Sequence, residues 1–435
     1  MKDQMGYELT GGTAQALDAY EQALHEMRCL TGNPVATLAP ALAQAPDFAM
    51  AQLLNAWMHV SSTELPAIAI ARESLAAARR LALNEREELH AAAIGQWCDG
   101  QWHAAARTLE DLNALYPHDA LALQMGQQLD FFTGDSRMLR DRMLRVLPSW
   151  SEEVPGYHAV LGMLAFGLEE TGDYARAEAA GRRAVELEPL DAWAQHAVAH
   201  VYEMQGRREE GIRWMHESTG WQESGFFLVH NWWHLALHHL ARGETAEALE
   251  LYDGAIRGNA ASMMDLIDCS AMLWRLELAG LDVGGRWTGL ADAFAPHAAS
   301  GNYAFNDLHA AMAFARAGRE DLLRSLRTAQ AVALTRRDDN AEFVTAVGAP
   351  AIEAMVAFAA GDHAQATSLL RTIRNRAARF GGSHAQRDLL DQTLIAAARS
   401  SGNASLAKAV ETEREQVLGY REFPVQGRPA FALAS

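Results

Sequence analysis

The 435 residues contain only three cysteines, Cys29, Cys98 and Cys269, and these are far apart in the chain. An odd and scattered set argues against a disulfide framework and against a Cys-based zinc site, and it favours a reducing cytoplasm. Proline is also scarce, at 12 residues, and β-branched and aromatic residues do not cluster in alternating runs. Because the pattern of a β protein is missing, the abundant alanine and leucine favour helix.

Positive charge is in deficit, with 37 Lys and Arg against 55 Asp and Glu and a net charge of −18. Such a surface repels phosphate backbones and anionic lipid, so we expect no nucleic-acid partner and no membrane partner. No apolar run reaches the roughly 18 residues that span a bilayer. The N-terminal MKDQMGYELTGG lacks the apolar core of a signal peptide. We therefore expect a soluble, cytoplasmic protein.

Helix–turn–helix repeats occupy most of the chain. When the segments 86–117 and 158–189 are aligned on their terminal prolines, Gly100 coincides with Gly172. Glycine can end the first helix in the left-handed conformation, small residues such as Ala177 allow close packing, and proline stops the second helix. Since such a pair cannot bury its apolar face alone, neighbouring pairs must stack. The sequence predicts an all-α, right-handed superhelix (an α-solenoid) with a concave ligand groove.

The repeat pattern also predicts how the chain is organised. Residues 1–259 are expected to form N-terminal and central helical repeats, and residues 305–416 to form C-terminal repeats. The period is lost over 260–304, which we expect to be an irregular insertion, and 417–435 is expected to be an extended tail. We expect these parts to belong to one continuous solenoid.

Histidines recur at the repeat period in the segment 229–240, VHNWWHLALHHL, and in the segment before it. His196 and His230 differ by 34 residues, and so do His200 and His234. The helix–turn–helix pattern resembles the tetratricopeptide repeat, whose period is 34 residues. In that repeat, positions 2, 5, 9 and 12 of the first helix face the groove, and spacings of three and four place those positions on one face of the helix. We therefore expect these histidines to line a groove rather than a core.

Imidazoles with a pKa near 6.5 suit acid–base chemistry at neutral pH, and a carboxylate can orient an imidazole. The motif FNDLH adds a second group of such residues, and GGSHAQRD reads as a loop that feeds a helix N-terminus, a site for an anion that Arg387 could clamp. The competing interpretation of GGSHAQRD is that Ser383 simply caps the helix. The candidate catalytic residues are His196, His200, Glu203, His230, His234, Asp307 and His309. The candidate substrate-binding residues are Trp193, Asn231, Trp233, Asn306, His384, Gln386, Arg387, Asp388 and His90.

The first functional hypothesis is a protein that binds a small metabolite with a carboxylate or amine group, and acts on it as a hydrolase, lyase or isomerase. No nucleophile elbow, phosphate loop or dinucleotide fingerprint is present, and no cofactor is predicted. The second hypothesis is a scaffold that binds a peptide or protein without catalysis. The third is a zinc or iron site, since His pairs at i, i+4 can chelate a metal. Its ligands would be His196, His200, Glu203, His230 and His234.

Two further alternatives stay open. A single buried histidine is more often structural than functional, which is the competing interpretation of His90, and the whole histidine set could merely pack between helices. The chain could also form a homo-oligomer.

Long segments of the sequence resemble the tetratricopeptide repeat protein 38 family. The resemblance rests on DAWAQHAVAHVYEMQGR, VHNWWHLALHHL, FNDLHAAMAFARAGR and GGSHAQRDLLDQTL, and it covers nearly the whole chain. It implies a soluble, cytosolic helical solenoid. It carries over no established activity, substrate or cofactor. The adjacent His238 and His239 depart from the bulkier or acidic residues expected there.

Overall fold

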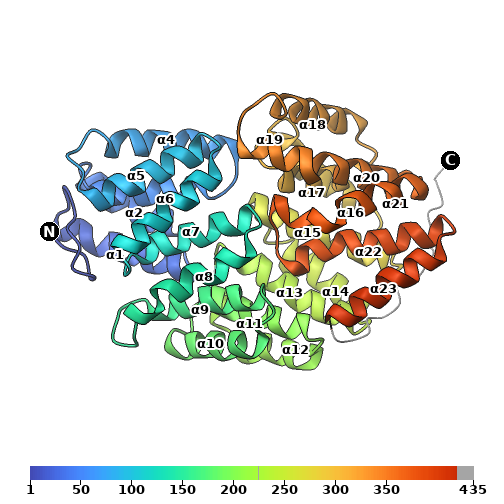
Figure 1. Cartoon of the computed structure of the whole chain (residues 1–435), viewed down its shortest axis with the longest axis horizontal. Coiled ribbons are helices and arrows are strands. Elements are labelled where there is room, and N and C mark those ends of the chain that lie inside the picture. Colours follow the sequence, from blue (N-terminus) through green and yellow to red (C-terminus); the bar gives the residue numbers. More distant parts are fainter. Residues whose placement is uncertain (224, 419–435) are drawn as a thin grey trace. The chain divides into compact units, whose positions relative to one another are not determined.

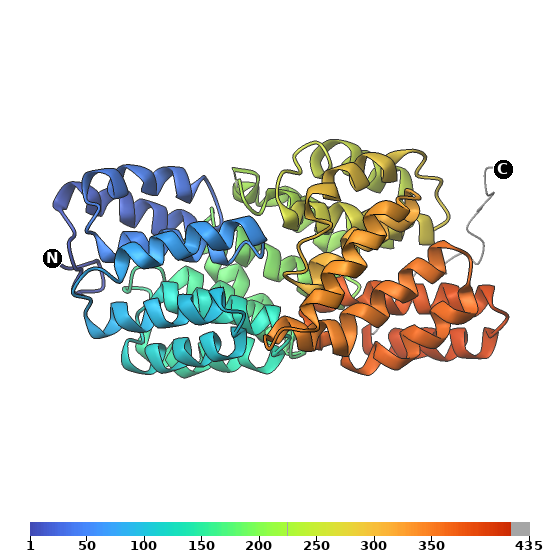
Figure 2. The same cartoon turned by 90° about the horizontal axis from the view of Figure 1, so that it is seen from above.

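The computed structural model describes residues 1–418 apart from residue 224, and these residues form helices joined by short turns (Figures 1 and 2). No β-strand occurs among them; one isolated bridge joins Lys2 and Glu8. The predicted all-α class is confirmed. Most of the predicted tail, 419–435, lies outside the described residues, and the last helix ends at Leu418.

The chain divides into two compact units. The first unit contains residues 1–201 and 216–228, and the second contains residues 202–215 and 229–435. The segment 260–304, where we expected an irregular insertion, lies within the second unit. That the chain forms one continuous solenoid stays a prediction.

Helix pairs make up the first unit, and each pair packs along its length. Its helices are α1 (Ala14–Cys29), α2 (Pro34–Gln44), α3 (Ala49–Val60), α4 (Leu65–Ala78), α5 (Glu85–Cys98), α6 (Trp102–Leu115), α7 (Ala120–Phe132), α8 (Ser136–Val146), α9 (Tyr157–Glu169) and α10 (Tyr174–Leu187). Two helices, α11 (Ala192–Met204) and α12 (Arg208–Glu217), carry residues of both units.

The turns form for the reasons that the sequence suggested. Gly100 and Gly172 have φ values of 76° and 83°, the left-handed conformation in which a side chain would be strained. Each lies between the two helices of a pair. Ala177 is completely buried, as close packing of α10 on α9 requires. Asn84 begins α5 with a capping box, in which its side chain and that of Glu87 each accept a backbone N–H of the other residue.

The second unit continues with α13 (Leu228–Ala241), whose first residue lies in the first unit. The helices that follow are α14 (Thr245–Leu251), α15 (Met263–Leu278), α16 (Arg286–Phe294), α17 (Ala304–Arg316), α18 (Glu320–Ala333), α19 (Asp339–Phe343), α20 (Ala349–Ala359), α21 (His363–Ile373), α22 (His384–Ser400) and α23 (Ala404–Leu418). Short 3-10 or π turns occur between several of them, among them η5 (Val344–Gly348).

The expectation of an irregular insertion over 260–304 was wrong, because that segment holds α15 and α16. Ser262 begins α15 with a capping box to Asp265. Nearly every residue of α15 is buried, so no face of the helix is exposed to solvent and its sequence lacks the exposed polar stripe of a surface helix. The glycine-rich LDVGG, residues 281–285, lies in the turn between the two helices.

In the part of the chain that the structure describes, one helical stretch, Asp339–Ala359, is long and apolar enough to cross a membrane by length and composition alone. It combines α19, η5 and α20. About half of its apolar window, 56%, is buried within the structure, and α20 packs against α17 and α21. The core helix of a globular protein has the same properties, so this single stretch is weak evidence for a membrane span.

Candidate functional site

Two histidine–glutamate pairs repeat along the chain at the 34-residue period. In the first unit, His200 Nδ1 lies 3.7 Å from a carboxylate oxygen of Glu169. In the second unit, His234 Nδ1 lies 3.1 Å from a carboxylate oxygen of Glu203. Each member of the second pair follows its counterpart by one repeat, so the same contact between neighbouring helices occurs twice. Three of these four residues were predicted from the sequence, and Glu169 was not.

The members of the first-unit pair are completely buried, with no exposed side-chain surface on either His200 or Glu169. The rings of His196 and His200 meet edge to face with centroids 4.4 Å apart. Phe166 lies 5.3 Å from the His200 ring, and Trp193 lies 5.0 Å from the His196 ring. Aromatic side chains therefore enclose these histidines, and Trp193 belongs to that packing.

The second-unit histidines stand on α13 and face two carboxylates. His230 Nδ1 lies 2.8 Å from Asp268 on α15, and Asp268 has no exposed side-chain surface. The rings of His230 and His234 are 4.9 Å apart, and the indole of Trp233 stacks on His230 at 5.3 Å. Asp268, which the sequence analysis missed, holds His230 much as Glu203 holds His234.

In the second unit, the pKa values of Glu203, His234 and His238 are strongly shifted. Burial raises the pKa of Glu203 from its ordinary value of 4.5 to about 7, although nearby His238 and Arg275 oppose the rise. Burial also lowers the pKa of His234 well below 6.5 and that of His238 to about 4. Near neutral pH, both imidazoles are therefore uncharged while the Glu203 carboxyl titrates. Glu203 keeps 19% of its side chain exposed, so protons can reach it from solvent.

Arg275, on α15, is a buried cation that the sequence analysis did not single out. Its side chain lies 5.4 Å from the centre of the Trp233 ring and donates a hydrogen bond to the Ala385 carbonyl at 2.5 Å. Its charge also contributes to the shifted pKa values of Glu203 and His234. A lone arginine in the apolar stretch SAMLWRLEL was the available signal, because an arginine in such a stretch needs a buried partner.

The motif FNDLH begins α17, and its candidate residues Asn306, Asp307 and His309 are all buried. Burial raises the pKa of Asp307 from 3.8 to about 7, and a hydrogen bond from Gln330 partly opposes the rise. Burial lowers the pKa of His309 to about 4, while its Nδ1–H donates to the carbonyl of Phe305 at 2.9 Å. Such shifts are typical of functional sites but also occur in structural networks.

The expected anion site at GGSHAQRD is replaced by ordinary capping. Ser383 accepts the backbone N–H of Gln386, and Gln386 accepts that of Ser383. Arg387 donates to the carbonyl of Gly382, and Asp388 forms a paired contact with Arg414 at 2.6 and 2.7 Å. Because these contacts are internal, the terminus of α22 does not present the clamp that we expected. His384, the first residue of α22, is partly buried.

His90 belongs to a buried network in the first unit. The indole N–H of Trp57 donates to its Nδ1 at 3.0 Å, and its Nε2 lies 3.0 Å from Asp119. Asp119 also accepts from Arg86 at 2.5 Å. Since both ring nitrogens are engaged, His90 offers no hydrogen-bonding atom to a ligand in this structure. The structural interpretation of this histidine is the one that the geometry favours.

The groove prediction required these histidines to be exposed to solvent, and the structure shows that they are buried. The exposed fraction of each residue is 5% or less. This holds for His196, His200, His230, His234 and His238. Aromatic rings and carboxylates of the same unit cover them, so their environment is a buried polar network. Asn231 is completely buried as well.

His238 packs against Gly211, where the absence of a side chain leaves room for the imidazole ring. A β-carbon at Gly211 would lie 2.4 Å from the His238 ring, which is only 1% exposed and has no room to move. We expect Gly211→Ala to lower the free energy of unfolding by about 1–3 kcal/mol through overpacking. Gly289→Ala is the matched control, because Gly289 is also helical but has open space beside it. There we expect a gain of up to about 1 kcal/mol. Urea unfolding of both variants measures the difference, and equal effects would refute the packing argument.

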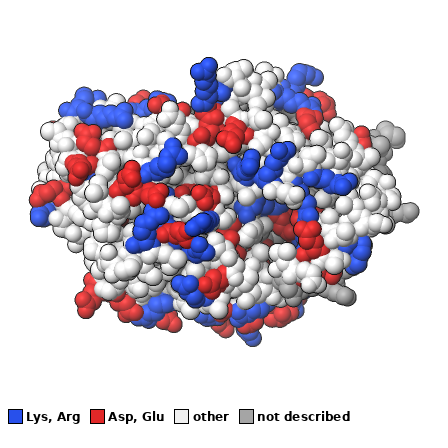
Figure 3. All heavy atoms as spheres, in the orientation of Figure 1, with Lys and Arg blue, Asp and Glu red and all other residues white. Residues whose placement is uncertain are grey.

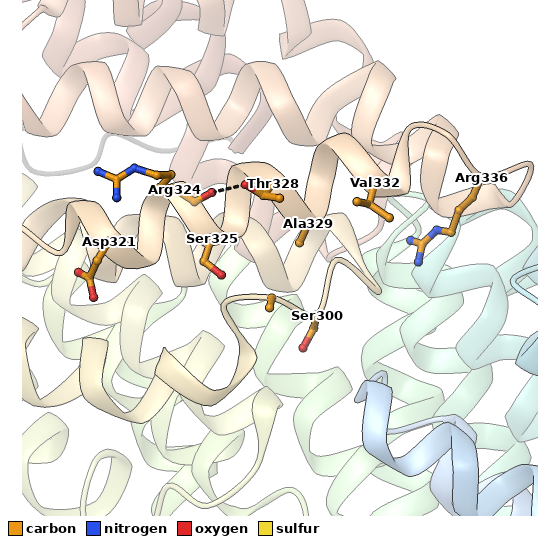
Figure 4. Close-up of a pocket in the computed structure, with 9 residues that line it drawn as sticks. Ser300, Asp321, Arg324, Ser325, Thr328, Ala329, Val332 and Arg336 are labelled. Atoms are coloured by element: carbon orange, nitrogen blue, oxygen red, sulfur yellow. Dashed lines mark hydrogen bonds between the residues drawn. The ribbon is translucent and has the colours of Figure 1, made fainter.

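A surface hollow of about 490 Å³ lies elsewhere in the second unit, along one side of α18 (Figure 4). Its lining combines small side chains with Asp321, Arg324 and Arg336. None of the candidate residues from the sequence lines it. On the face shown in Figure 3, acidic and basic side chains are intermingled over the surface. The prediction that nucleic acid is not a partner therefore continues to rest on the net charge alone.

No family model matches the chain. Its structure is similar to that of the human IFIT1 dimer with m7Gppp-AAAA, with a TM-score of 0.40 and 13% sequence identity. The match covers 96% of this chain and 98% of that chain. The resemblance to the tetratricopeptide repeat protein 38 family stays a prediction. The helix pairs, their glycine turns and the contacts that recur at 34 residues establish a broader class than that family. The chain is an all-α helical-repeat protein of the tetratricopeptide-like kind.

Proposed function

We propose that the second unit binds a small metabolite with a carboxylate or amine group beside Glu203 and His234, and that this pair transfers protons to or from it. One observation carries the proposal. The carboxyl of Glu203 has a pKa of about 7 and lies 3.1 Å from a buried, uncharged imidazole. A proton donor and acceptor is most effective when its pKa is near the working pH.

The surroundings of the pair suit that role. Glu203 is 19% exposed whereas His234 is completely buried, so the carboxyl is the member that a ligand or water could reach. The buried Arg275 supplies positive charge that would favour an anionic group nearby. Chemistry of this kind is compatible with a hydrolase, a lyase or an isomerase, and proton transfer by these two side chains needs no cofactor.

The first-unit pair provides an internal comparison. Glu169 and His200 repeat the arrangement one period earlier, but both are completely sealed from solvent. We infer that this pair, together with His196, serves packing, because no reactant can approach it without a local opening. This confines the proposed chemistry to the second unit and excludes His196 and His200 from it.

A thermal-shift screen with small carboxylates and amines, followed by turnover assays on the ligands found, tests the proposal. We expect Glu203→Gln and His234→Gln to lower turnover by about 10²–10⁴-fold, the range for loss of general acid–base catalysis. The matched variants Glu169→Gln and His200→Gln should change stability while ligand binding and turnover persist in the folded protein.

Two outcomes would contradict the proposal. One is that no carboxylate or amine stabilises the protein. The other is that variants of both pairs lower turnover only in proportion to the folded fraction. If the ligand instead proves to be a peptide that binds equally well to the Glu203→Gln variant, a scaffold function replaces catalysis.

A further inference from the structure

Four potential metal ligands come together in the first unit, away from the residues discussed so far. They are His25, Cys29, His158 and Glu188, and each offers one ligand atom within 4.8 Å of the others. His25 and Cys29 are one helical turn apart on α1, so their side chains share a face. His158 lies at the start of α9, and Glu188 directly follows α10.

The distances approach those of a tetrahedral metal site. His25 Nε2 lies 3.8 Å from the sulfur of Cys29 and 3.8 Å from a carboxylate oxygen of Glu188. Zinc bonds of about 2.0–2.3 Å place neighbouring tetrahedral ligand atoms roughly 3.3–3.7 Å apart. These two distances exceed that range by only a few tenths of an ångström, and the other pairs of ligand atoms lie within 4.8 Å, so modest side-chain rotations would close the site around one ion. The rings of His25 and His158 have centroids 6.2 Å apart.

The carboxylate of Asp191 contacts His158 in the way that a carboxylate typically supports a metal-binding histidine. Nδ1 of His158 lies 2.7 Å from Asp191, whose side chain has no exposed surface. Metal-binding histidines typically use their second nitrogen in this way, which fixes the ring and leaves the other nitrogen for the metal. Asp191 is itself fixed, because its second carboxylate oxygen accepts the backbone N–H of Ala194 at 2.8 Å. His158 is therefore presented with Nε2 available.

Access and charge are also suitable. Cys29 is completely buried, but 33% of the His25 side chain and 23% of that of Glu188 are exposed, which gives an ion a route inward. A thiolate and a carboxylate together balance a divalent cation, and Asp191 adds a third negative charge nearby. The adjacent Arg28 opposes this with one positive charge. The balance still favours a cation.

We propose that His25, Cys29, His158 and Glu188 bind one divalent metal ion of the zinc class. Four protein ligands close the tetrahedron, which is typical of structural rather than catalytic sites. The ion would join α1 to α9 and to the turn after α10, segments that are far apart in the sequence. This site contains none of the ligands that the sequence predicted and does not depend on the proposed function of the second unit.

Titration of the metal-free full-length protein with Co²⁺ tests the proposal. We expect one equivalent to produce the intense visible bands of tetrahedral cobalt together with a near-ultraviolet thiolate-to-cobalt band. Cys29→Ser should abolish the thiolate band. Cys98→Ser is the matched control and should leave the spectrum unchanged, because Cys98 is also buried but lies outside the cluster.

Two further variants cover the case in which Cys29→Ser fails to fold. His25→Asn changes a partly exposed side chain, and Asp191→Asn keeps an oxygen for the cap of α11 while it removes the charge behind His158. We expect each to weaken zinc binding by at least about tenfold, as loss of a ligand or of a supporting carboxylate does. Cobalt that binds without a thiolate band, or with equal affinity in the wild type and both variants, would show adventitious binding only and overturn the proposal.

Discussion

Asp119→Asn is expected to lower the free energy of unfolding of the first unit by about 3 kcal/mol or more, because it leaves a buried cation without its main partner. Asp119 is 1% exposed and accepts from both Arg86 and His90. The charge of Arg86 and the hydrogen bonds from Arg86 and His90 hold the pKa of Asp119 far below the ordinary value despite its burial. Arg86, itself 5% exposed, would keep Asp3 at 3.1 Å as its remaining ion-pair partner. Urea unfolding followed by circular dichroism measures the change.

Asn was chosen at this position because Asp119 also caps α7, accepting the backbone N–H of Ala122 at 2.9 Å. An asparagine preserves that cap, so the loss reports the charge. Asp99→Asn is the control, since the Arg72–Asp99 pair is 53% and 57% exposed and should contribute no more than about 1 kcal/mol. If both variants lost the same stability, the buried network would not be a major stabilising element.

Glu203→Gln is expected to stabilise the protein at pH 8.5 and to have little effect at pH 4. The folded-state pKa of about 7 lies above the ordinary value of 4.5, so the folded protein holds this proton more tightly than the unfolded chain does. Stability from this group is therefore fully present below pH 4.5 and is lost as the pH rises to about 7. The difference between the two pKa values corresponds to at most about 3 kcal/mol in the free energy of unfolding. Glutamine carries no such proton and avoids the loss.

Thermal or urea unfolding of wild type and variant across this pH range provides the measurement. Glu244→Gln is the matched control, because Glu244 also contacts a histidine, His239, at 2.7 Å but is 34% exposed. We expect no comparable difference between pH 4 and pH 8.5 at that position. A Glu203→Gln variant whose stability parallels that of the wild type at every pH would show that Glu203 titrates normally, and would remove the basis of the proposed acid–base pair.

The helical repeats and their turns were predictable, because they depend on local chemistry. Gly100 and Gly172 have the conformation that their place in the repeat required. The pairing of a carboxylate with an imidazole was foreseen in kind, and the structure pairs Glu203 of α11 with His234 of α13. The missed pair partner, Glu169, lies one period before Glu203 and could have been found by applying the period to the acids as well as to the histidines.

Exposure was not predictable in the same way. The spacing correctly placed His196 beside His200 and His230 beside His234, each pair on one face of its own helix. Whether such a face is exposed to solvent depends on which side chains of other helices cover it. Phe166 and Trp193 enclose His196 and His200 in this structure. The anion site expected at Arg387 failed for a similar reason, because Ser383 and Gln386 satisfied each other locally.

By itself, the sequence determined the helical class, the position of most turns and the 34-residue period at which histidines and acids recur. These follow from backbone propensity and from side-chain spacing along a helix, which neighbours in space alter little. Only the tertiary structure decided that those histidines are buried, that Arg275 stands among them, and that Cys29 lies beside His158. Such contacts join residues that are distant in the chain, and they depend on how whole helices pack against one another.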